Sequence, residues 1–378
     1  MNQATVEFRN VSKQYGPQGA VVDLSLLVPA GDICVLVGPS GCGKTTSLKM
    51  VNRLVEPSSG QVLIDGQDIM KIDVTALRRG IGYVIQQIGL FPHQTVAENI
   101  GTVPRLLGWP RARIQQRTEE LLDLIGLDPA RVRNRYPAQL SGGERQRVGV
   151  ARAMAAEPPV MLMDEPFGAV DPIVRERLQN EFLRLHRTLG TTVLFVTHDI
   201  DEAIKMGTRV AVMQQGGHLA QYAPPTDLLA HPASDFVSRF VGVDRGLKRL
   251  SLLRVADVHL EPGVVAHVGE PSQSARHRAL ESESDWVLLL DKGEAPIGWI
   301  KTVELDHAQA LTAQDVDASS PLVHHETTLR DALSMLLTSL VQTAVVVDDQ
   351  GRYLGTLTLD ELGLAFRSDP APQSAPVP

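Results

Sequence analysis

Short apolar runs alternate with longer amphipathic segments through the first 240 or so residues. The runs "ICVLVG", "PPVMLMDE" and "TTVLFVTHD" have the length and composition of strands that are buried on both faces of a parallel sheet. Between about residues 87 and 155 the pattern is mostly helical, with "RTEELLDLIGL" as a clear amphipathic segment, and it returns to strand at Val160. The pattern predicts an α/β domain over residues 1-242, with a helical subdomain inserted at about 87-155.

The chain changes character after "PASDFVSRFVGVDRGLKRL", which predicts a last amphipathic helix and a charged joint. A shift of 57 residues aligns "VLLLDKGEAPIGWIKTVEL" with "AVVVDDQGRYLGTLTLDEL" without a gap, and chance agreement of a short apolar pattern is the alternative. The matched positions are Asp291, Gly298, Glu304 and Leu305 on Asp348, Gly355, Glu361 and Leu362. Two copies of a strand, turn, strand, helix-start unit are expected to pack as a pair, forming a smaller α+β domain over residues 250-367. The Pro/Ser-rich end, residues 368-378, is predicted to be a disordered tail.

Charge and composition narrow the classes of partner. A formal net charge of -8 argues against a protein that binds nucleic acid through its overall field. The start "MNQATVEFRN" lacks the features of a secretion signal, and no apolar run approaches the roughly 20 residues of a membrane helix. If the protein serves a membrane, we expect it to act from the surface.

Cysteines and histidines add little chemistry at this stage. Cys34 and Cys42 flank one turn and are consistent with a reducing cytoplasm rather than a disulfide framework. The eleven histidines show no metal-ligand spacing, and the adjacent His324 and His325 are interpreted as polar loop residues.

A glycine-rich turn follows the first buried strand and precedes a helical pattern. Gly38, Gly43, Lys44 and Thr45 satisfy G-x-x-x-x-G-K-[ST]. Backbone N–H groups can surround a triphosphate only where side chains do not obstruct them, and the following helix N-terminus adds its positive end. Lys44 would reach the β- and γ-phosphates, Thr45 would offer its hydroxyl to Mg²⁺, and Thr46 would support a phosphate oxygen. A purely structural turn is the alternative.

A second buried strand, "VMLMDEP", delivers two carboxylates to its carboxyl end, where ligands bind in open α/β sheets. Asp164 is predicted to hold Mg²⁺ through water, and Glu165 to orient the attacking water and accept its proton. Taken alone, such an acidic pair could also begin a surface loop.

Three further side chains fit the same site. His198 ends the strand "TTVLFVTHD" and could hydrogen-bond the γ-phosphate, although a histidine at a strand end is usually structural. Gln86 closes the strand in "IGYVIQQIGLFPH" and could reach both the metal-bound water and whatever docks on the following loop. Tyr15, in "VSKQYG", is placed to stack on an adenine, and a core position is the alternative.

The stretch "LSGGERQRVGVARA" is the most specific feature. Ser141, Gly142 and Gly143 precede a helix rich in arginine and apolar residues, which predicts an open helix N-terminus that attracts an anion. It lies about a hundred residues from the phosphate loop, so we expect a second chain to bring it to the nucleotide.

Together these motifs resemble the nucleotide-binding subunit of an ATP-binding cassette (ABC) transporter. "GPSGCGKTT" is similar to its Walker A motif, "VMLMDEP" to Walker B and "LSGGERQ" to its signature, while Gln86, Asp171 in "FGAVDP" and His198 match its Q-loop, D-loop and switch histidine. The resemblance covers residues 1 to about 242 and implies an ABC-type P-loop domain with a helical subdomain. The nucleotide-binding positions that it implies are Tyr15, Gly38, Ser40, Gly41, Gly43, Lys44, Thr45, Thr46, Ser141, Gly142, Gly143 and Asp171.

The resemblance also implies roles and partners. Glu165, His198, Gln86 and Lys44 would be catalytic, and Thr45, Gln86 and Asp164 would serve Mg²⁺. In this family two cassettes sandwich two ATP molecules, each held by one chain's phosphate loop and the other chain's signature. We therefore expect a homodimer, bound to integral-membrane permease subunits at the cytoplasmic face of the inner membrane, with an extracytoplasmic substrate-binding protein beyond them.

Other segments resemble one subfamily. "IGYVIQQIGLFPHQTVAENI", "VPRLLGW" and "FVGVDRGLKRLSLL" are similar to importers of quaternary-amine osmoprotectants such as glycine betaine, carnitine or choline. The cargo alternative is an amino acid, a polyamine or a sulfonate. The 57-residue repeat resembles a tandem cystathionine-β-synthase (CBS) domain, which could bind an adenine or cyclic dinucleotide. However, Glu361 replaces the family's ribose-contacting aspartate and Lys301 replaces its threonine, so a structural or dimer-forming role is the alternative.

Overall fold

The computed structural model describes residues 3–85, 89–168, 171–305, 309–317, 321–339 and 341–367, with residues 365–367 described by their backbone alone. The chain divides into two compact units, Met1–Gly242 and Val243–Pro378, here called unit 1 and unit 2. Each has hydrophobic cores built from its own residues.

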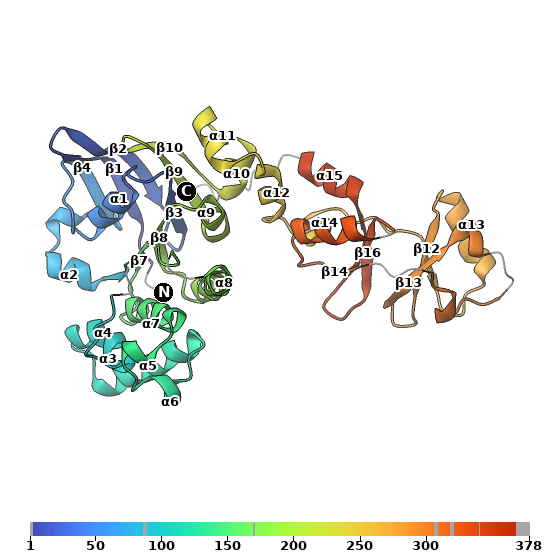
Figure 1. Ribbon diagram of the computed structural model, residues 1–378, viewed down its shortest axis with the longest axis horizontal. Coiled ribbons are helices and arrows are strands. Elements are labelled where there is room, and N and C mark those ends of the chain that lie inside the picture. The colour runs from blue at the N-terminus through green and yellow to red at the C-terminus, as the bar shows by residue number, and fades with distance from the viewer. Residues whose placement is uncertain are drawn as a thin grey trace. The chain divides into compact units, whose positions relative to one another are not determined.

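Unit 1 contains two sheets (Figure 1). The larger has the strand order β10-β9-β3-β8-β7-β6 and is parallel except for β10. The smaller is antiparallel, with the order β2-β1-β4-β5. The strands are β1 (Val6–Tyr15), β2 (Gln18–Val28), β3 (Ile33–Val37), β4 (Ser59–Ile64), β5 (Gln67–Asp68), β6 (Ile81–Val84), β7 (Val160–Asp164), β8 (Thr192–Thr197), β9 (Arg209–Gln214) and β10 (His218–Ala223).

The three apolar runs of the sequence form β3, β7 and β8, the middle strands of the larger sheet. Every residue in these strands is buried. Some of their side chains pack in one core with side chains of the smaller sheet and of α1 (Lys44–Val51). The helices outside the inserted segment are α1 (Lys44–Val51), η1 (Ile69–Lys71), α2 (Val74–Arg79), α8 (Pro172–Leu189), α9 (Ile200–Met206), α10 (Pro225–Ala230) and α11 (Asp235–Val241). The predicted α/β architecture is thus present.

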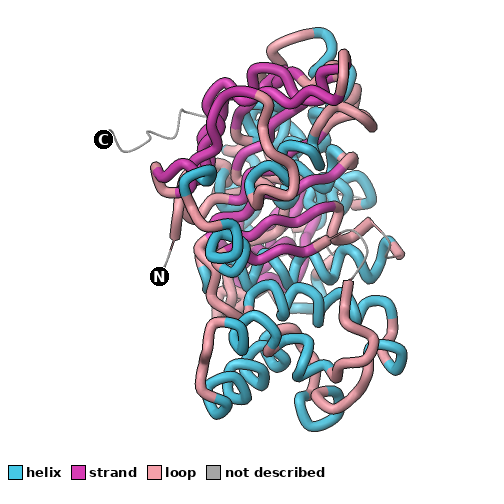
Figure 2. The backbone as a smooth tube through the Cα atoms, turned by 90° about the vertical axis from the view of Figure 1, so that its left-hand side faces the viewer, coloured by secondary structure: helices cyan, strands magenta, loops and turns pink. Residues whose placement is uncertain are grey.

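A group of helices lies in the sequence between β6 and β7, two strands that are paired side by side in the larger sheet. Figures 1 and 2 show these helices gathered to one side of the strands of unit 1. They are α3 (Val96–Ile100), α4 (Thr102–Leu106), α5 (Arg111–Leu124), α6 (Pro129–Val132), η2 (Pro137–Gln139) and α7 (Gly142–Met154). The amphipathic pattern in α5 buries Ile114, Leu121 and Leu122, which is how this helix joins the group.

Unit 2 contains two copies of one motif. In each, a short strand pairs in parallel with the first strand of an antiparallel hairpin, giving the orders β11-β12-β13 and β14-β15-β16. The first copy comprises β11 (Val265–His267), α13 (Ser272–Glu281), β12 (Trp286–Leu290) and β13 (Pro296–Lys301). The second comprises β14 (Leu322–His324), α14 (Leu329–Thr338), β15 (Thr343–Val347) and β16 (Tyr353–Thr358). Each of these elements lies 57 residues from its counterpart, at both of its ends.

The two copies share a core but differ at their ends. Leu288, Leu290 and Trp299 of the first copy pack with Val345 and Val347 of the second. After β13 the expected helix start is only the single turn η4 (Thr302–Glu304), whereas after β16 it continues as α15 (Leu359–Arg367). The remaining short turns are η3 (Val255–Asp257) and η5 (Ala313–Asp315).

The charged joint of the sequence analysis is itself helical. Residues of this segment form α12 (Arg245–Leu250), and Leu250 is buried in a core of unit 2. Within the described residues, no helix combines the length and the apolar character that crossing a bilayer requires. The predicted tail, 368-378, lies outside the described residues.

Candidate active site

The predicted site residues follow neighbouring strands. β3, β8, β7 and β6 are adjacent and parallel, with Val37 paired to Thr197 and Asp164 paired to Val196. Their carboxyl ends therefore meet at one edge of the sheet. The phosphate loop follows β3, His198 follows β8 and Glu165 follows β7, while Gln86 comes just after β6 but lies outside the described residues.

The phosphate loop has no room for side chains at two of its glycines. Gly43 has φ +95°, and a Cβ atom there would lie 2.2 Å from the Ala20 carbonyl oxygen of β2. A Cβ atom at Gly38 would lie 2.1 Å from the Met213 carbonyl oxygen of β9. Gly43 is also the N-cap of α1 and offers no capping side chain. The loop thus leads directly into a helix N-terminus whose first N–H groups are available to an anion.

Lys44 is held inside this loop. Its side chain is almost fully buried, and Nζ donates hydrogen bonds to the carbonyl oxygens of Gly38 at 2.7 Å and Pro39 at 3.0 Å. The ammonium group is therefore already at the loop, where it can exchange a carbonyl oxygen for a phosphate oxygen by a small movement of a flexible side chain. Ser40 and Gly41 are exposed in the same loop.

Thr45 and Asp164 meet across the sheet edge. The Thr45 hydroxyl donates a hydrogen bond of 2.9 Å to Asp164 Oδ1. Asp164 is only 6% exposed, and this burial raises its pKa, although the Thr45 hydrogen bond and the charges of Lys49 and Lys44 act in the opposite direction. A buried carboxylate beside a hydroxyl offers the hard oxygen ligands that Mg²⁺ prefers, so this pair fits the ion.

Glu165 and His198 form a second pair. His198 Nδ1 lies 3.1 Å from Glu165 Oε1, within hydrogen-bonding distance, and the imidazole is largely exposed. Glu165 has φ +45°, a left-handed conformation that is costly for a residue with a Cβ atom. Its backbone N–H is fixed by a 3.0 Å hydrogen bond to the Val196 carbonyl oxygen of β8. The left-handed turn at Glu165 thus places its carboxylate beside the His198 imidazole, where β7 and β8 end.

The helix after the "LSGG" stretch begins differently from the prediction. Ser141 caps α7: its Oγ accepts from the Glu144 N–H at 3.2 Å, and the Glu144 carboxylate accepts from the Ser141 N–H at 2.8 Å. These hydrogen bonds hold the pKa of Glu144 below its ordinary value. A capping box therefore satisfies the Ser141 and Glu144 N–H groups within the chain, because Glu144, three residues after Ser141, is itself an anion. Ser141 and Gly142 are exposed, and Gly143 is half-buried.

Two predicted residues have structural roles in the single chain. Asp171 caps α8, its Oδ1 accepting from the Val174 N–H at 3.1 Å. Tyr15 ends β1 and is 53% exposed, with Lys13 Nζ 5.2 Å from its ring centre. Tyr15 pairs with Gln18 at the start of β2, the strand that also supplies Ala20 to the phosphate loop. The nucleotide contacts of Asp171 and Tyr15 stay predictions.

Asn99 is a residue that the sequence reasoning missed. It is fully buried in α3, and its Oδ1 accepts from the Phe91 N–H at 2.8 Å. Its Nδ2 donates to the carbonyl oxygens of Phe91, Gln94 and Thr95 at 3.1, 3.1 and 3.0 Å. One side chain thus fixes the loop that follows Gln86. An asparagine on the buried face of a helical pattern is the signal that could have revealed it, because asparagine is a poor residue for a helix interior.

Glu361 and Lys301, the two residues that differ from the CBS pattern, make different contacts in the two repeats of unit 2. Glu361 Oε2 accepts from the Thr358 N–H at 2.6 Å and from its hydroxyl at 3.0 Å, which caps α15. The other oxygen, Oε1, is buried and has no hydrogen-bond partner in the described part of the chain. At the matching place of the first copy, Lys301 Nζ lies 3.6 Å from Glu304.

Known proteins resemble this chain in sequence and in fold. The ABC transporter family model matches residues 21–168. The osmoprotectant import ATP-binding protein OsmV of Salmonella typhimurium is 47% identical over 94% of each chain. The glycine betaine/carnitine/choline transport ATP-binding protein OpuCA of Bacillus subtilis is 42% identical over 93% of this chain and 94% of its own. A sulfate/thiosulfate import ATP-binding protein, CysA of Synechocystis, is 44% identical but over only 63% of this chain.

Among solved structures, the dimeric bacterial ABC transporter cassette MJ0796 is 34% identical and covers 58% of this chain and 98% of its own, with a TM-score of 0.53. The fold and the site define a P-loop nucleotide-binding ATPase of α/β architecture. The relatives that match nearly the whole chain are ATP-binding proteins of transporters, a narrower class than P-loop ATPases in general. The chain belongs to the ABC transporter family, as one of its ATP-binding, ATP-hydrolysing proteins.

Proposed function

We propose that the protein hydrolyses ATP to drive the import of a quaternary-amine osmoprotectant, such as glycine betaine, carnitine or choline, through separate permease subunits. The observation that carries this proposal is the extent of the matches. The osmoprotectant-type relatives match both units, at 93 to 94% of the chain, whereas the sulfate-type relative matches 63%. The cargo is therefore inferred from a likeness that includes the repeats of unit 2.

Within the site, each residue has a proposed role. Lys44 and the backbone N–H groups of the loop bind the phosphates, and Thr46 supports them. Thr45 and Asp164 hold Mg²⁺, which supplies charge neutralisation for the leaving phosphates when it is bound, and Gln86 is proposed to contact the same ion. Glu165 accepts a proton from the attacking water. His198, which lies within hydrogen-bonding distance of Glu165, is proposed to hydrogen-bond the γ-phosphate.

A second copy of the chain is part of this proposal. The exposed Ser141 and Gly142, together with Gly143, would contact the nucleotide held by the partner's phosphate loop, and Asp171 is proposed to contact a nucleotide as well. The dimeric state of the MJ0796 cassette supports such an arrangement. Because Ser141 Oγ only accepts from the Glu144 N–H, we infer that its hydroxyl hydrogen can donate to a phosphate oxygen while the cap stays in place.

The permease is proposed to dock on the loop that follows Gln86. Phe91 and Pro92 are exposed there, and Leu90 is half-buried. This loop joins the nucleotide site to a surface that an amphipathic segment of a membrane protein can cover, which is how a chemical step becomes a movement. The protein would then lie at the cytoplasmic face of the inner membrane as a peripheral subunit, with the substrate-binding protein beyond the permease.

Unit 2 is proposed to be a tandem CBS-like regulatory domain that binds an adenine or cyclic dinucleotide. The buried Glu361 Oε1 supports this, because it is an acceptor without a partner in the described part of the chain, next to the "G-x-x-T" of Gly355 and Thr358.

Uptake of labelled glycine betaine tests the function. Cells carry either the natural protein or Glu165→Gln, at low and high osmolarity, with choline, carnitine and proline as competitors. We expect the substitution to preserve ATP binding and to abolish uptake, because the amide oxygen cannot accept the proton of the attacking water. Uptake that is unchanged in the variant would remove glycine betaine as the cargo and direct the search to amino acids, polyamines or sulfonates. Purified Glu165→Gln that still hydrolyses ATP at the natural rate would remove Glu165 as the base.

A further inference from the structure

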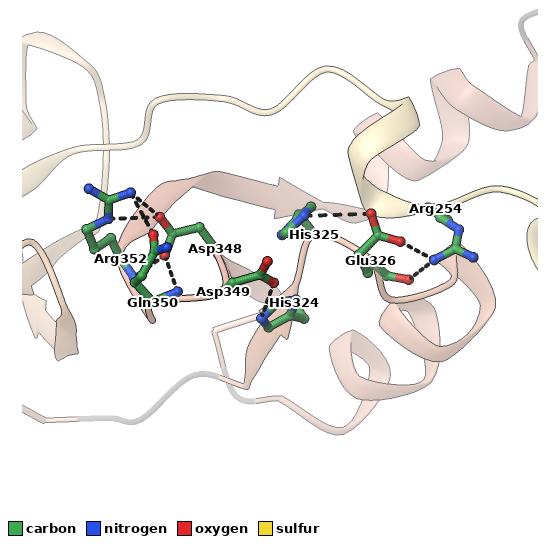
Figure 3. Close-up of polar contacts among 8 residues, drawn as sticks. All are labelled: Arg254, His324, His325, Glu326, Asp348, Asp349, Gln350 and Arg352. Atoms are coloured by element: carbon green, nitrogen blue, oxygen red, sulfur yellow. Dashed lines mark hydrogen bonds and ion pairs between the residues drawn. The ribbon is translucent and has the colours of Figure 1, made fainter. Parts of the chain in front are cut away.

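Two histidines and an aspartate converge in the second copy of the repeat. His324, His325 and Asp349 each offer one possible metal-ligand atom, and these three atoms all lie within 4.8 Å of one another (Figure 3). The sequence alone predicts that both histidines are polar loop residues. That is wrong for His324, which ends β14.

The fold brings these residues together from distant parts of the chain. β14 and β15 are parallel with His324 paired to Val347, and the His325 N–H donates to the Val347 carbonyl oxygen at 3.2 Å. Asp349 follows β15 by two residues, so the turn at the end of the hairpin places it beside the end of β14. Sheet register therefore sets the position of His324, and the short turns that follow β14 and β15 place His325 and Asp349 beside it.

The neighbouring aspartate is already committed to the turn. Asp348 accepts hydrogen bonds from the N–H groups of Gln350 and Arg352, both at 2.9 Å, and from Arg352 Nε at 2.8 Å. Asp349 instead points its carboxylate at His324, with 3.5 Å between Oδ1 and Nε2. Figure 3 shows the two aspartates directed to opposite partners.

The His325 ring has one nitrogen without an assigned partner. Nδ1 is buried and makes no hydrogen bond within the described residues. Nε2 lies 3.7 Å from Glu326 Oε1, and the Glu326 carboxylate is in turn bound by Arg254. The rings of His324 and His325 stand 5.0 Å apart, centre to centre. A buried imidazole nitrogen with no partner normally signals a missing ligand, because leaving such an atom unsatisfied costs free energy.

We propose that His324, His325 and Asp349 bind a divalent transition-metal ion of the Zn²⁺ type. Imidazole nitrogens suit zinc, nickel and copper, whereas Mg²⁺ and Ca²⁺ take sites made mainly of oxygen. Two imidazoles and one carboxylate are a set that zinc sites use, with water completing the coordination. Glu326, held by Arg254, orients the His325 ring from outside the metal's own ligands.

The first copy of the repeat lacks this set at the same positions. A shift of 57 residues places His267, Val268 and Lys292 where the second copy has His324, His325 and Asp349. His267 Nε2 lies 3.2 Å from Glu294, so one histidine–carboxylate pair is present there, but the second imidazole is absent and a lysine replaces the aspartate. The proposal therefore applies to the second copy alone.

Zn²⁺ titration of the full-length protein, free of nucleotide and Mg²⁺, tests the site. We expect one tight Zn²⁺ per chain in calorimetry, with affinity at least tenfold lower in His325→Gln and in Asp349→Asn. The matched control is His267→Gln in the first copy, which should bind Zn²⁺ as the natural protein does. Excess Mg²⁺ should not displace the zinc.

Two further measurements keep the outcome clear. Unfolding temperatures in EDTA should be the same for the natural protein and all three variants, which shows that any loss of binding is not a loss of fold. Co²⁺ in place of Zn²⁺ should give visible absorption bands that disappear with His325→Gln. Zinc binding that is equal in the natural protein and the two site variants, or that never saturates, would overturn the proposal. Neither readout depends on ATP hydrolysis or on the cargo.

Discussion

At the scale of single residues, the two neighbouring carboxylates of the site have different surroundings. Asp164 is buried and bonded to Thr45, whereas Glu165, the next residue, turns out of the strand in a left-handed conformation and meets His198. The apolar run before them could be predicted to end at the ligand-binding edge. The conformation at Glu165 and the internal contacts of Lys44 could not, because they depend on β8 and on the closed shape of the loop.

The buried Asp164 gives the nucleotide-free protein a pH-dependent stability. Because burial raises its pKa, the folded state holds this proton more tightly than the unfolded chain. The free energy of unfolding should therefore fall as the pH rises from the ordinary carboxyl pKa through the raised one, and the cost is complete above it. Asp164→Asn removes the ionisation but keeps an oxygen for the Thr45 hydroxyl. We expect the variant to melt higher than the natural protein at neutral pH, by about 2 to 4 °C for each 1 kcal/mol.

Thermal unfolding without nucleotide or Mg²⁺, between about pH 4 and pH 8, checks this expectation. The gap between the two proteins should close as the pH is lowered. Asp123→Asn, at an exposed position of α5, is the control and should alter the melting temperature little. A variant that melts lower than the natural protein at neutral pH would show that the lysines more than offset the burial of Asp164.

At the scale of elements, adjacent parallel strands do most of the positioning. Which runs are strands, and that their carboxyl ends carry the chemistry, could be predicted from the sequence. The closure of α7 by Glu144 and the fixing of the loop 91–95 by Asn99 could not. Both depend on which of several possible hydrogen bonds a polar side chain makes, and a pattern of apolar positions does not contain that information.

Asn99 is the residue through which α3 holds the proposed permease-docking loop. Asn99→Ala removes four hydrogen bonds from a fully buried position, so we expect a loss of about 2 to 4 kcal/mol in the free energy of unfolding. Uptake should decrease more than basal ATPase activity, because the loop lies apart from the phosphate loop in the sequence and carries the exposed Phe91.

Urea unfolding, ATPase assays and uptake measured on the same variant separate these effects. Asn180→Ala, on the exposed face of α8, is the matched control and should change none of the three by much. Equal loss of uptake and of basal ATPase activity in Asn99→Ala would contradict a role in the docking loop.

At the scale of the whole molecule, the chain consists of units with separate cores. The sequence predicts a second domain over 250-367, but α12 already belongs to unit 2, since Leu250 packs in its core. The boundary shifted because a short charged segment looks like a joint in a sequence, whereas one buried leucine is enough to recruit it into a helix that packs.

A chain truncated after Gly242 should fold and keep basal ATPase activity, because the described core of unit 1 is built from residues of unit 1. A chain truncated after residue 250 should have a lower melting temperature than one truncated after Gly242, since Leu250 of α12 would be left without its partners. Circular dichroism melting and ATPase assays compare the two proteins. Responses to salt or to a cyclic dinucleotide should be lost in both. Responses that survive the truncation would remove unit 2 as the regulatory element.

The exact correspondence of the two repeats has a historical consequence. Copies whose strands and helices begin and end 57 residues apart, with no insertion in either, point to duplication of one ancestral segment. Since then the copies have kept Asp291 and Gly298 at the places of Asp348 and Gly355. They have diverged elsewhere, where one has Val268, Lys292 and Lys301 and the other His325, Asp349 and Thr358. At a position where the two copies differ, the residue in one copy is therefore a candidate for the ancestral residue of the other.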